Sequence, residues 1–291
     1  MSTYKVYNYS FGPIIGHPQL PLDNNLLKDG EDPMIHKQEF FQRFFSISQG
    51  KSFYHKTRHY INILMDEGNI VIFQIDNEKS VTIEENFKKR QEKDHPSCIV
   101  IVDNRKDVQR ILIENNHAFT NPDVVKNILK NIFRRHMKSY SLYIDIWAAS
   151  NPRNFWKTVA KYPKGIKEIK FIFPRKNLPR VSDKVGPYLD YKTLSEDTNC
   201  APIIYMKAPT GTLHLDEGNP RLNALVEGSA EVGVGSQCIK PVGSRSYITC
   251  GENSSVTINI ADSIVYQPQQ MDAFETRLEK IAEKLNSLKK S

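Results

Sequence analysis

The sequence contains two pairs of apolar runs, and each run has the length of a single β-strand. Residues 60–65 and 70–75 flank a polar turn at 66–69, and residues 98–102 and 108–113 flank another at 103–107. Short apolar runs separated by Gly, Asn and Asp are typical of β-hairpins. The two pairs therefore predict an antiparallel sheet of hairpins.

Helical periodicity is clearest after residue 121. Asn121 and Pro122 form an N-cap followed by a proline in the first turn. The apolar positions that follow recur with a period of 3.6: Val124, Val125, Ile128, Leu129, Ile132 and Phe133. Similar patterns predict helices over 35–47 and from the start signal Ser150-Asn151-Pro152. The whole is an α+β fold, with helices packed on the antiparallel sheet.

The composition changes near residue 185, where Gly, Pro, Ser and Thr become frequent. We expect an α+β domain with a basic helical surface over residues 1–184, and a β-rich domain over residues 185–291 that ends in an amphipathic helix. Six apolar residues at heptad spacing define that helix: Met271, Phe274, Leu278, Ile281, Leu285 and Leu288. The stripe spans under three heptads, so packing on its own domain is favoured, and pairing in a homodimer stays open. Residues 80–94, dense in charge, predict a solvated helix or connector.

The overall composition is that of a globular chain. Of 291 residues, 39% are hydrophobic and 25% charged, too apolar for disorder of the whole chain. The cysteines at 98, 200, 238 and 250 form no Cys-x-x-Cys pair, so we expect reduced thiols and no structural zinc. Because the first residues lack the pattern of a signal peptide, we expect a soluble, cytoplasmic protein.

Positive charge is concentrated in one segment. The formal net charge is +7, and residues 151–184 alone carry ten basic and two acidic side chains. Residues 1–150 have a net charge of +2, and residues 185–291 a net charge of −3. A local excess of cations favours an anionic partner.

Cations recur four residues apart on two predicted helices and continue into the segment that follows. Each Lys or Arg that neutralises a phosphate releases counterions and adds affinity that does not depend on sequence. Lysine predominates, which favours contact with the backbone over the reading of bases. We therefore predict sequence-nonspecific binding of double-stranded DNA by thirteen residues: Lys126, Lys130, Arg134, Lys138, Arg153, Lys157, Lys161, Lys164, Lys167, Lys170, Arg175, Lys176 and Arg180.

Three other interpretations stay open. Lysine-rich faces of helices are often merely solvated. The same patch could dock an acidic protein partner, which would make the chain a non-enzymatic interaction subunit. Asp145, followed by Glu168 and Lys170, resembles the acid and acid-x-Lys arrangement of metal-dependent nucleases. No dinucleotide loop, phosphate loop or nucleophile signature is present, so we expect no cofactor and, on balance, no enzyme.

Residues 68–133 contain, in order, a strand at 69–75, a turn at 76–80, a charged connector, a strand at 96–102 and a helix start at 119–122. This order of elements resembles that of the RexA-like phage-exclusion proteins. It implies a two-domain α+β protein that binds double-stranded DNA with little sequence preference. It also implies a dimer that acts with a membrane partner against phage infection. No shared motif assigns DNA contacts, so the thirteen residues rest on charge alone.

Overall fold

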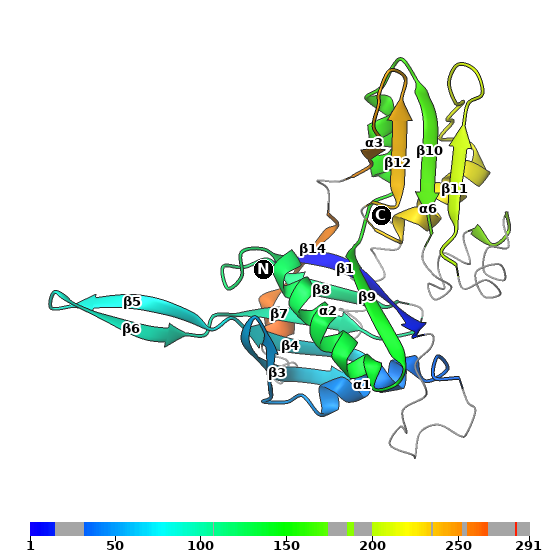
Figure 1. Cartoon of the computed structure of the whole chain (residues 1–291). Coiled ribbons are helices and arrows are strands. Elements are labelled where there is room, and N and C mark those ends of the chain that lie inside the picture. The colour runs from blue at the N-terminus through cyan, green and yellow to red at the C-terminus, as the bar shows by residue number, and fades with distance from the viewer. Residues whose placement is uncertain are drawn as a thin grey trace. The chain divides into compact units, whose positions relative to one another are not determined.

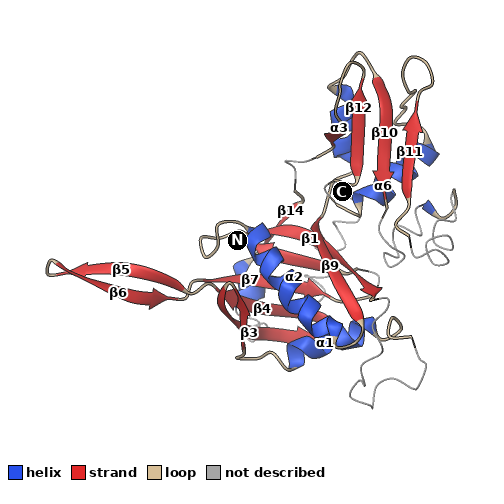
Figure 2. Cartoon of the chain, viewed as in Figure 1, coloured by secondary structure: helices blue, strands red, loops and turns tan. Residues whose placement is uncertain are grey.

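The computed structural model describes residues 1–14, 32–106, 108–173, 185–188, 200–233, 235–251, 255–266 and 283. These residues form an α+β protein with antiparallel sheets, as the apolar runs predict (Figures 1 and 2). The described residues divide into two compact units. The first contains residues 1–5, 11–146 and those from 257 on, and the second contains Val6–Ser10 and Trp147–Val256.

An eight-stranded sheet organises the first unit. Its strands follow the order β14 (Thr257–Ile260), β1 (Ser2–Pro13), β8 (Arg110–Glu114), β7 (Ser97–Asp103), β4 (Ile70–Asp76), β3 (Thr57–Glu67) and β2 (Ser52–His55), and β9 (Leu142–Ala148) pairs with β1. Both predicted hairpins are confirmed, because β3 pairs with β4 and β7 with β8, each antiparallel. Strands β4, β7 and β8 are almost wholly buried.

Two helices cover the sheet through a cluster of phenylalanines. Helix α1 (Lys37–Ser46) and helix α2 (Pro122–Lys138) lie where the periodicity predicts them. The Asn121 side chain accepts a hydrogen bond from the Val124 backbone N–H at 3.2 Å, which confirms the predicted N-cap. The Phe133 ring of α2 contacts three rings of α1 at centroid distances of 4.9–5.9 Å: Phe41, Phe44 and Phe45. These rings fix α1 and α2 against each other.

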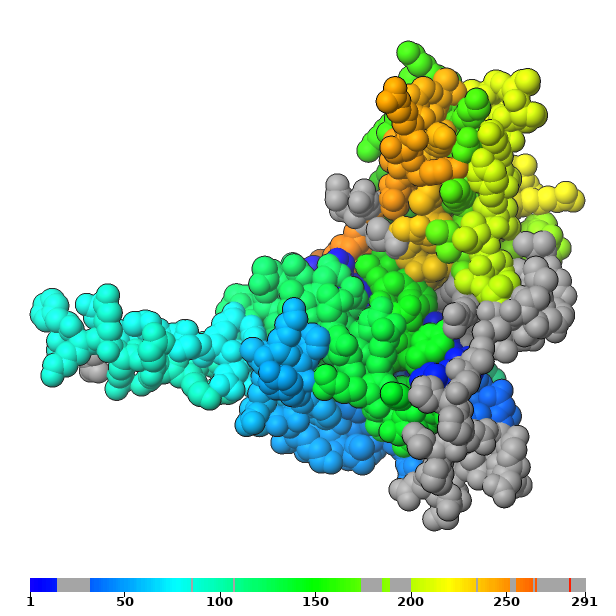
Figure 3. Space-filling model, viewed as in Figure 1, coloured from blue at the N-terminus to red at the C-terminus, as the bar shows by residue number. Residues whose placement is uncertain are grey.

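Residues 79–94 form a two-stranded arm rather than the solvated helix or connector that their charge predicts. Strands β5 (Lys79–Glu85) and β6 (Lys88–Asp94) pair only with each other and extend away from the rest of the first unit (Figures 1 and 3). The prediction was wrong because the arm packs on no core. The two strands of the arm therefore need few apolar residues, because side-chain pairs across the strands stabilise them instead of burial in a core.

A smaller sheet organises the second unit. Its strands follow the order β11 (Ile203–Lys207), β10 (Ile166–Ile172), β12 (Gln237–Pro241) and β13 (Ile248–Thr249). Helices α3 (Arg153–Ala160) and α6 (Pro220–Ala230) share one core with this sheet, in which the Phe155 ring lies 5.4 Å from Phe171. Both helices therefore cover the same face. Helix α6 was not predicted, although Asn219-Pro220 repeats the start signal of α2.

The structure divides the chain elsewhere than at residue 185. Strand β10 precedes that position, yet it pairs with β11 and β12, so the change of composition falls between neighbouring strands of one sheet. Strand β14 returns to pair with β1, and α7 (Asp262–Tyr266) follows it. The apolar stripe from Met271 to Leu288 lies outside the described residues.

The cysteines and the lengths of the helices bear on two further features, disulfides and membrane spans. The four cysteines are free thiols, and Cys98 and Cys250 are buried. None of the helices in the described residues has the length and apolar character needed to cross a membrane.

Candidate nucleic-acid interface

Two cations on α3 and the cation at its C-cap form an exposed row, which we call the α3 row: Arg153, Lys157 and Lys161. They follow one another at four-residue spacing, about 6 Å along the helix axis. Phe155 on the opposite side is fully buried and anchors α3 to the sheet. Within the described part of the chain, no residue of the α3 row takes part in an ion pair. Their charges are therefore available to a partner.

Lys164 and Lys167 continue the positive charge beyond the end of α3. Both side chains are exposed, and neither is ion-paired among the described residues. The described residues of the second unit carry ten basic and five acidic side chains, so the excess of positive charge extends to this unit as a whole. Arg175, Lys176 and Arg180, which the sequence also predicts as contacts, lie outside the described residues.

The four cations on α2, which we call the α2 row, lie in a different environment: Lys126, Lys130, Arg134 and Lys138. Lys130 and Arg134 both bind the Asp145 carboxylate of β9, and Arg134 also donates to the Ile144 carbonyl at 2.9 Å. Lys126 is half-buried, and burial lowers the pKa of its ammonium group. Only Lys138 and Arg134 are exposed. The α2 row is thus partly neutralised within the first unit.

Lys170 lies on the other face of the small sheet from α3. Along β10, Ile169 and Phe171 point toward the helices, so Glu168 and Lys170 point to the face that α3 and α6 leave uncovered. The Lys170 ammonium group lies 3.9 Å from the centroid of the Tyr247 ring. The six predicted contacts that are described in the second unit therefore do not all lie on one surface.

Glu168 is bound by groups from neighbouring strands. Its carboxylate accepts a hydrogen bond from the Tyr247 hydroxyl at 2.5 Å. The ammonium groups of Lys207 and Lys240 lie 3.8 Å and 3.7 Å away. The Tyr247 hydrogen bond lowers the pKa of the Glu168 carboxyl, and the two lysines lower it further. The negative charge of Glu168 thus partly neutralises Lys207 and Lys240 on this face of the sheet.

The uncovered face carries residues that sequence reasoning missed. Tyr205 and Lys207 of β11 and Lys240 of β12 share it, and the Tyr205 side chain is 49% exposed. The alternation of residue types along 203–207 and 237–241 could have predicted this shared face, because every second residue of a strand lies on the same face of the sheet. Phe171 and Phe173, which lie among the cations in the sequence, are buried in the core.

The nuclease alternative requires Asp145 and Glu168. Asp145 belongs to the first unit and Glu168 to the second, and each carboxylate contacts cations of its own unit. Among the residues described, no group of three or more His, Cys, Asp or Glu side chains is arranged to hold a metal ion. No observation on the described residues favours this alternative.

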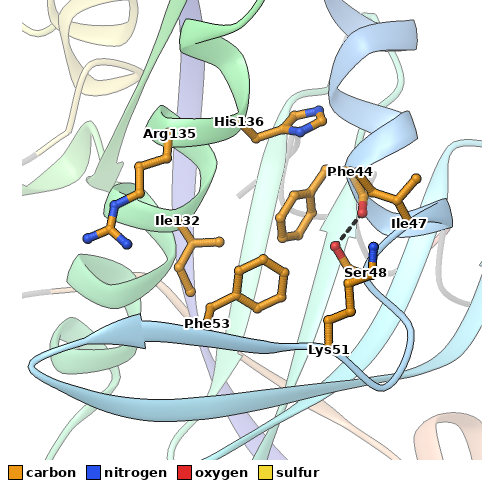
Figure 4. A pocket seen from close by; sticks show the side chains of 8 residues that line it. All are labelled: Phe44, Ile47, Ser48, Lys51, Phe53, Ile132, Arg135 and His136. Carbon is orange, nitrogen blue, oxygen red and sulfur yellow. Dashed lines mark hydrogen bonds between the residues drawn. The ribbon is translucent and has the colours of Figure 1, made fainter.

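A pocket in the first unit lies between α1, β2 and α2, and no sequence pattern pointed to it. Figure 4 shows its lining, which includes Phe44, Phe53 and Ile132, with Lys51 and Arg135 among the polar residues. Its volume is about 300 Å³. His136 also lines the pocket; its ring is hydrogen-bonded to the Phe40 carbonyl at 2.8 Å, and burial lowers the pKa of the imidazole.

A scan against models of protein families finds no match, and a search of curated proteins returns no significant one.

Proposed function

We propose that the protein binds double-stranded DNA without sequence preference, and that the α3 row with Lys164 and Lys167 contacts the phosphates. One observation carries this proposal. These five cations are exposed and unpaired within the described residues of a unit in which basic side chains outnumber acidic ones. Unpaired cations in a row can replace the counterions of a nucleic-acid backbone.

The residue types support phosphate contact rather than base readout. Four of the five cations are lysines, whose ammonium group is a point charge without the planar fork of arginine. Bidentate arginine contacts are the commonest means of reading guanine. Contacts to phosphate fix orientation on the duplex but carry no sequence information. The interface therefore supports affinity without specificity.

Fluorescence anisotropy with a labelled duplex tests this function. The logarithm of affinity should fall linearly with the logarithm of salt concentration, with a slope near −0.9 for each phosphate neutralised. Duplexes of scrambled sequence and equal length should bind alike. The absence of salt-dependent affinity at low ionic strength would show that the α3 row is a solvated face or a protein-docking surface.

We place this activity in phage exclusion on the resemblance of residues 68–133 to the RexA-like proteins. That setting adds a partner protein in the membrane and a homodimer as further parts of the proposal. Plaque counts on the native host, which supplies the membrane partner, test the setting when the chain is present or removed. Expression should reduce plaque number, and replacement of the α3 row by glutamine should restore it. Equal counts with and without the chain would reject the setting and leave the DNA contact to be judged by binding.

A further inference from the structure

The β5–β6 arm has no role in the core of the first unit. Its strands pair from Lys79 opposite Asp94 to Glu85 opposite Lys88, and they form a sheet of their own. Every residue of β6 is exposed. An isolated two-stranded hairpin is marginally stable in water. An arm of this kind contributes little to the fold, so its role is to be sought in a contact outside the chain.

The tip of the arm has an unusual residue. Asn86 and Phe87 have φ angles of 52° and 62°, both in the left-handed region. A two-residue turn of this geometry favours Asn followed by Gly, because glycine adopts positive φ without strain. Phe87 occupies the glycine position, where a bulky side chain is disfavoured. Its side chain is 98% exposed and gains nothing from packing.

The combination of backbone strain and full exposure indicates a contact outside the chain. Residues with a strained backbone cluster at functional sites. An aromatic ring at the end of an arm is placed to enter a partner. The arm therefore presents Phe87 as a probe, and the neighbouring charges indicate what it enters.

Three cations follow Phe87 directly in the chain: Lys88, Lys89 and Arg90. Lys88 is exposed and without an ion pair among the described residues. Lys89 lies 3.8 Å from Glu84, and Arg90 lies 3.0 Å from Glu92, in exposed pairs of the kind that contribute little to stability. These cations can exchange their partners for phosphates. An aromatic ring beside cations suits a nucleic acid, in which charged phosphates flank stacked bases.

We propose that the β5–β6 arm is a second contact to duplex DNA, in which Phe87 inserts between base pairs and Lys88, Lys89 and Arg90 bind the adjacent phosphates. A two-stranded ribbon fits a DNA groove. Apolar side chains inserted between base steps unstack them and bend the duplex. The proposal rests on the DNA binding proposed above and adds a distortion of the duplex, which phosphate contacts alone do not produce.

The test uses the full chain and a duplex that contains 2-aminopurine, whose fluorescence rises when the base is unstacked. The wild-type protein should raise this fluorescence on binding. Phe87→Gly should abolish the rise and weaken binding about tenfold, the order of a single base–aromatic contact. Because glycine suits the left-handed turn, this variant keeps the arm folded. Phe87→Trp, which keeps an aromatic ring, should retain the signal.

The salt dependence separates the ring from the cations. Phe87→Gly should leave the slope of affinity against salt unchanged, since no charge is removed. Replacement of Lys88, Lys89 and Arg90 by glutamine should reduce the slope by about one unit, since Glu84 and Glu92 already compensate the charges of Lys89 and Arg90. Unchanged 2-aminopurine fluorescence and affinity in Phe87→Gly, with wild-type DNA binding intact, would overturn the role of the arm alone. Absence of wild-type DNA binding would overturn both proposals.

Vesicles provide the competing outcome. An exposed aromatic with cations also suits an anionic lipid surface. Sedimentation with vesicles of phosphatidylglycerol and phosphatidylcholine should show no binding that depends on Phe87. Loss of vesicle binding in Phe87→Gly, without an effect on DNA, would assign the arm to a membrane and contradict the proposal.

Discussion

Arg134 on α2 lies 3.1 Å from the carboxylate of Asp145 on β9, and Lys130 binds the same carboxylate. These ion pairs distinguish the α2 row from the α3 row, although the two rows have the same four-residue spacing in the sequence. Two of the four cations in the α2 row form ion pairs with Asp145 on β9, whereas the α3 row has no acidic partner among the described residues. The charges of α3 are therefore the better candidates for a polyanion.

Asp145→Asn tests how much this cluster stabilises the first unit. The side chains of Arg134 and Asp145 are 45% and 42% exposed, so solvent screens their attraction. We expect the free energy of unfolding to change by less than about 1 kcal/mol. Urea denaturation followed by circular dichroism measures it. A loss several times larger would mean that the cluster is a structural element rather than a surface contact.

Phe133→Ala should destabilise the first unit strongly. The ring is fully buried against Phe41, Phe44 and Phe45. Its removal leaves a cavity at the contact of α1 with α2, and such substitutions cost about 3–5 kcal/mol. Val124→Ala on the exposed side of α2 is the control, with an expected change within about 0.5 kcal/mol. Similar losses of unfolding free energy in both variants would contradict the arrangement of the core.

His136 should make stability depend on pH. Burial lowers the imidazole pKa from 6.5, and the nearby Arg43 lowers it further, so the native state binds a proton less readily than the unfolded chain. The free energy of unfolding should therefore fall as pH decreases through 6.5 toward the lower native pKa. His136→Gln, which keeps an N–H group, should show a smaller fall. Parallel curves for both proteins between pH 8 and about pH 5 would show that His136 does not contribute.

Glu168→Gln should destabilise the second unit near neutral pH. The native carboxyl has a pKa below the usual value of 4.5, because it accepts the Tyr247 hydrogen bond and faces two lysines. Its contribution is present above pH 4.5 and is lost as pH falls through the lower native pKa. The stability difference between wild type and variant should accordingly shrink in acid. Glu217→Gln, at an exposed position, is the matched control and should have no comparable effect.

The elements that sequence analysis predicted carry local signals. Helix α2 has Asn121 and Pro122 at its start and an uninterrupted 3.6 period, and both hairpins have short polar turns. Pairings between distant segments leave no such signal. Ser2 pairs with Ile260 across almost the whole chain, and periodicity does not reveal that register. The β5–β6 arm was missed because its strands have no buried face.

The exposure of the cations in the candidate interface could be predicted from local spacing, but their contacts with distant residues could not. Helical spacing places the α3 row on the side away from Phe155, and the structure has these cations exposed. The neutralisation of Lys130 and Arg134 depends on Asp145, which lies on a separate strand. Lys170 was assigned to the same interface because charge counts ignore which face of a strand a residue occupies.

The most direct test compares the salt dependence of duplex binding by two variants. Replacement of Arg153, Lys157 and Lys161 together by glutamine should reduce the slope by roughly two to three units, with stability nearly unchanged because exposed positions contribute within about 0.5 kcal/mol each. The matched variant, with Lys130 and Arg134 replaced by glutamine, should reduce the slope by less than about one unit, since Asp145 already compensates these charges. An unchanged slope in the α3 variant, or an equal reduction per charge in both, would contradict the assignment of the interface to α3.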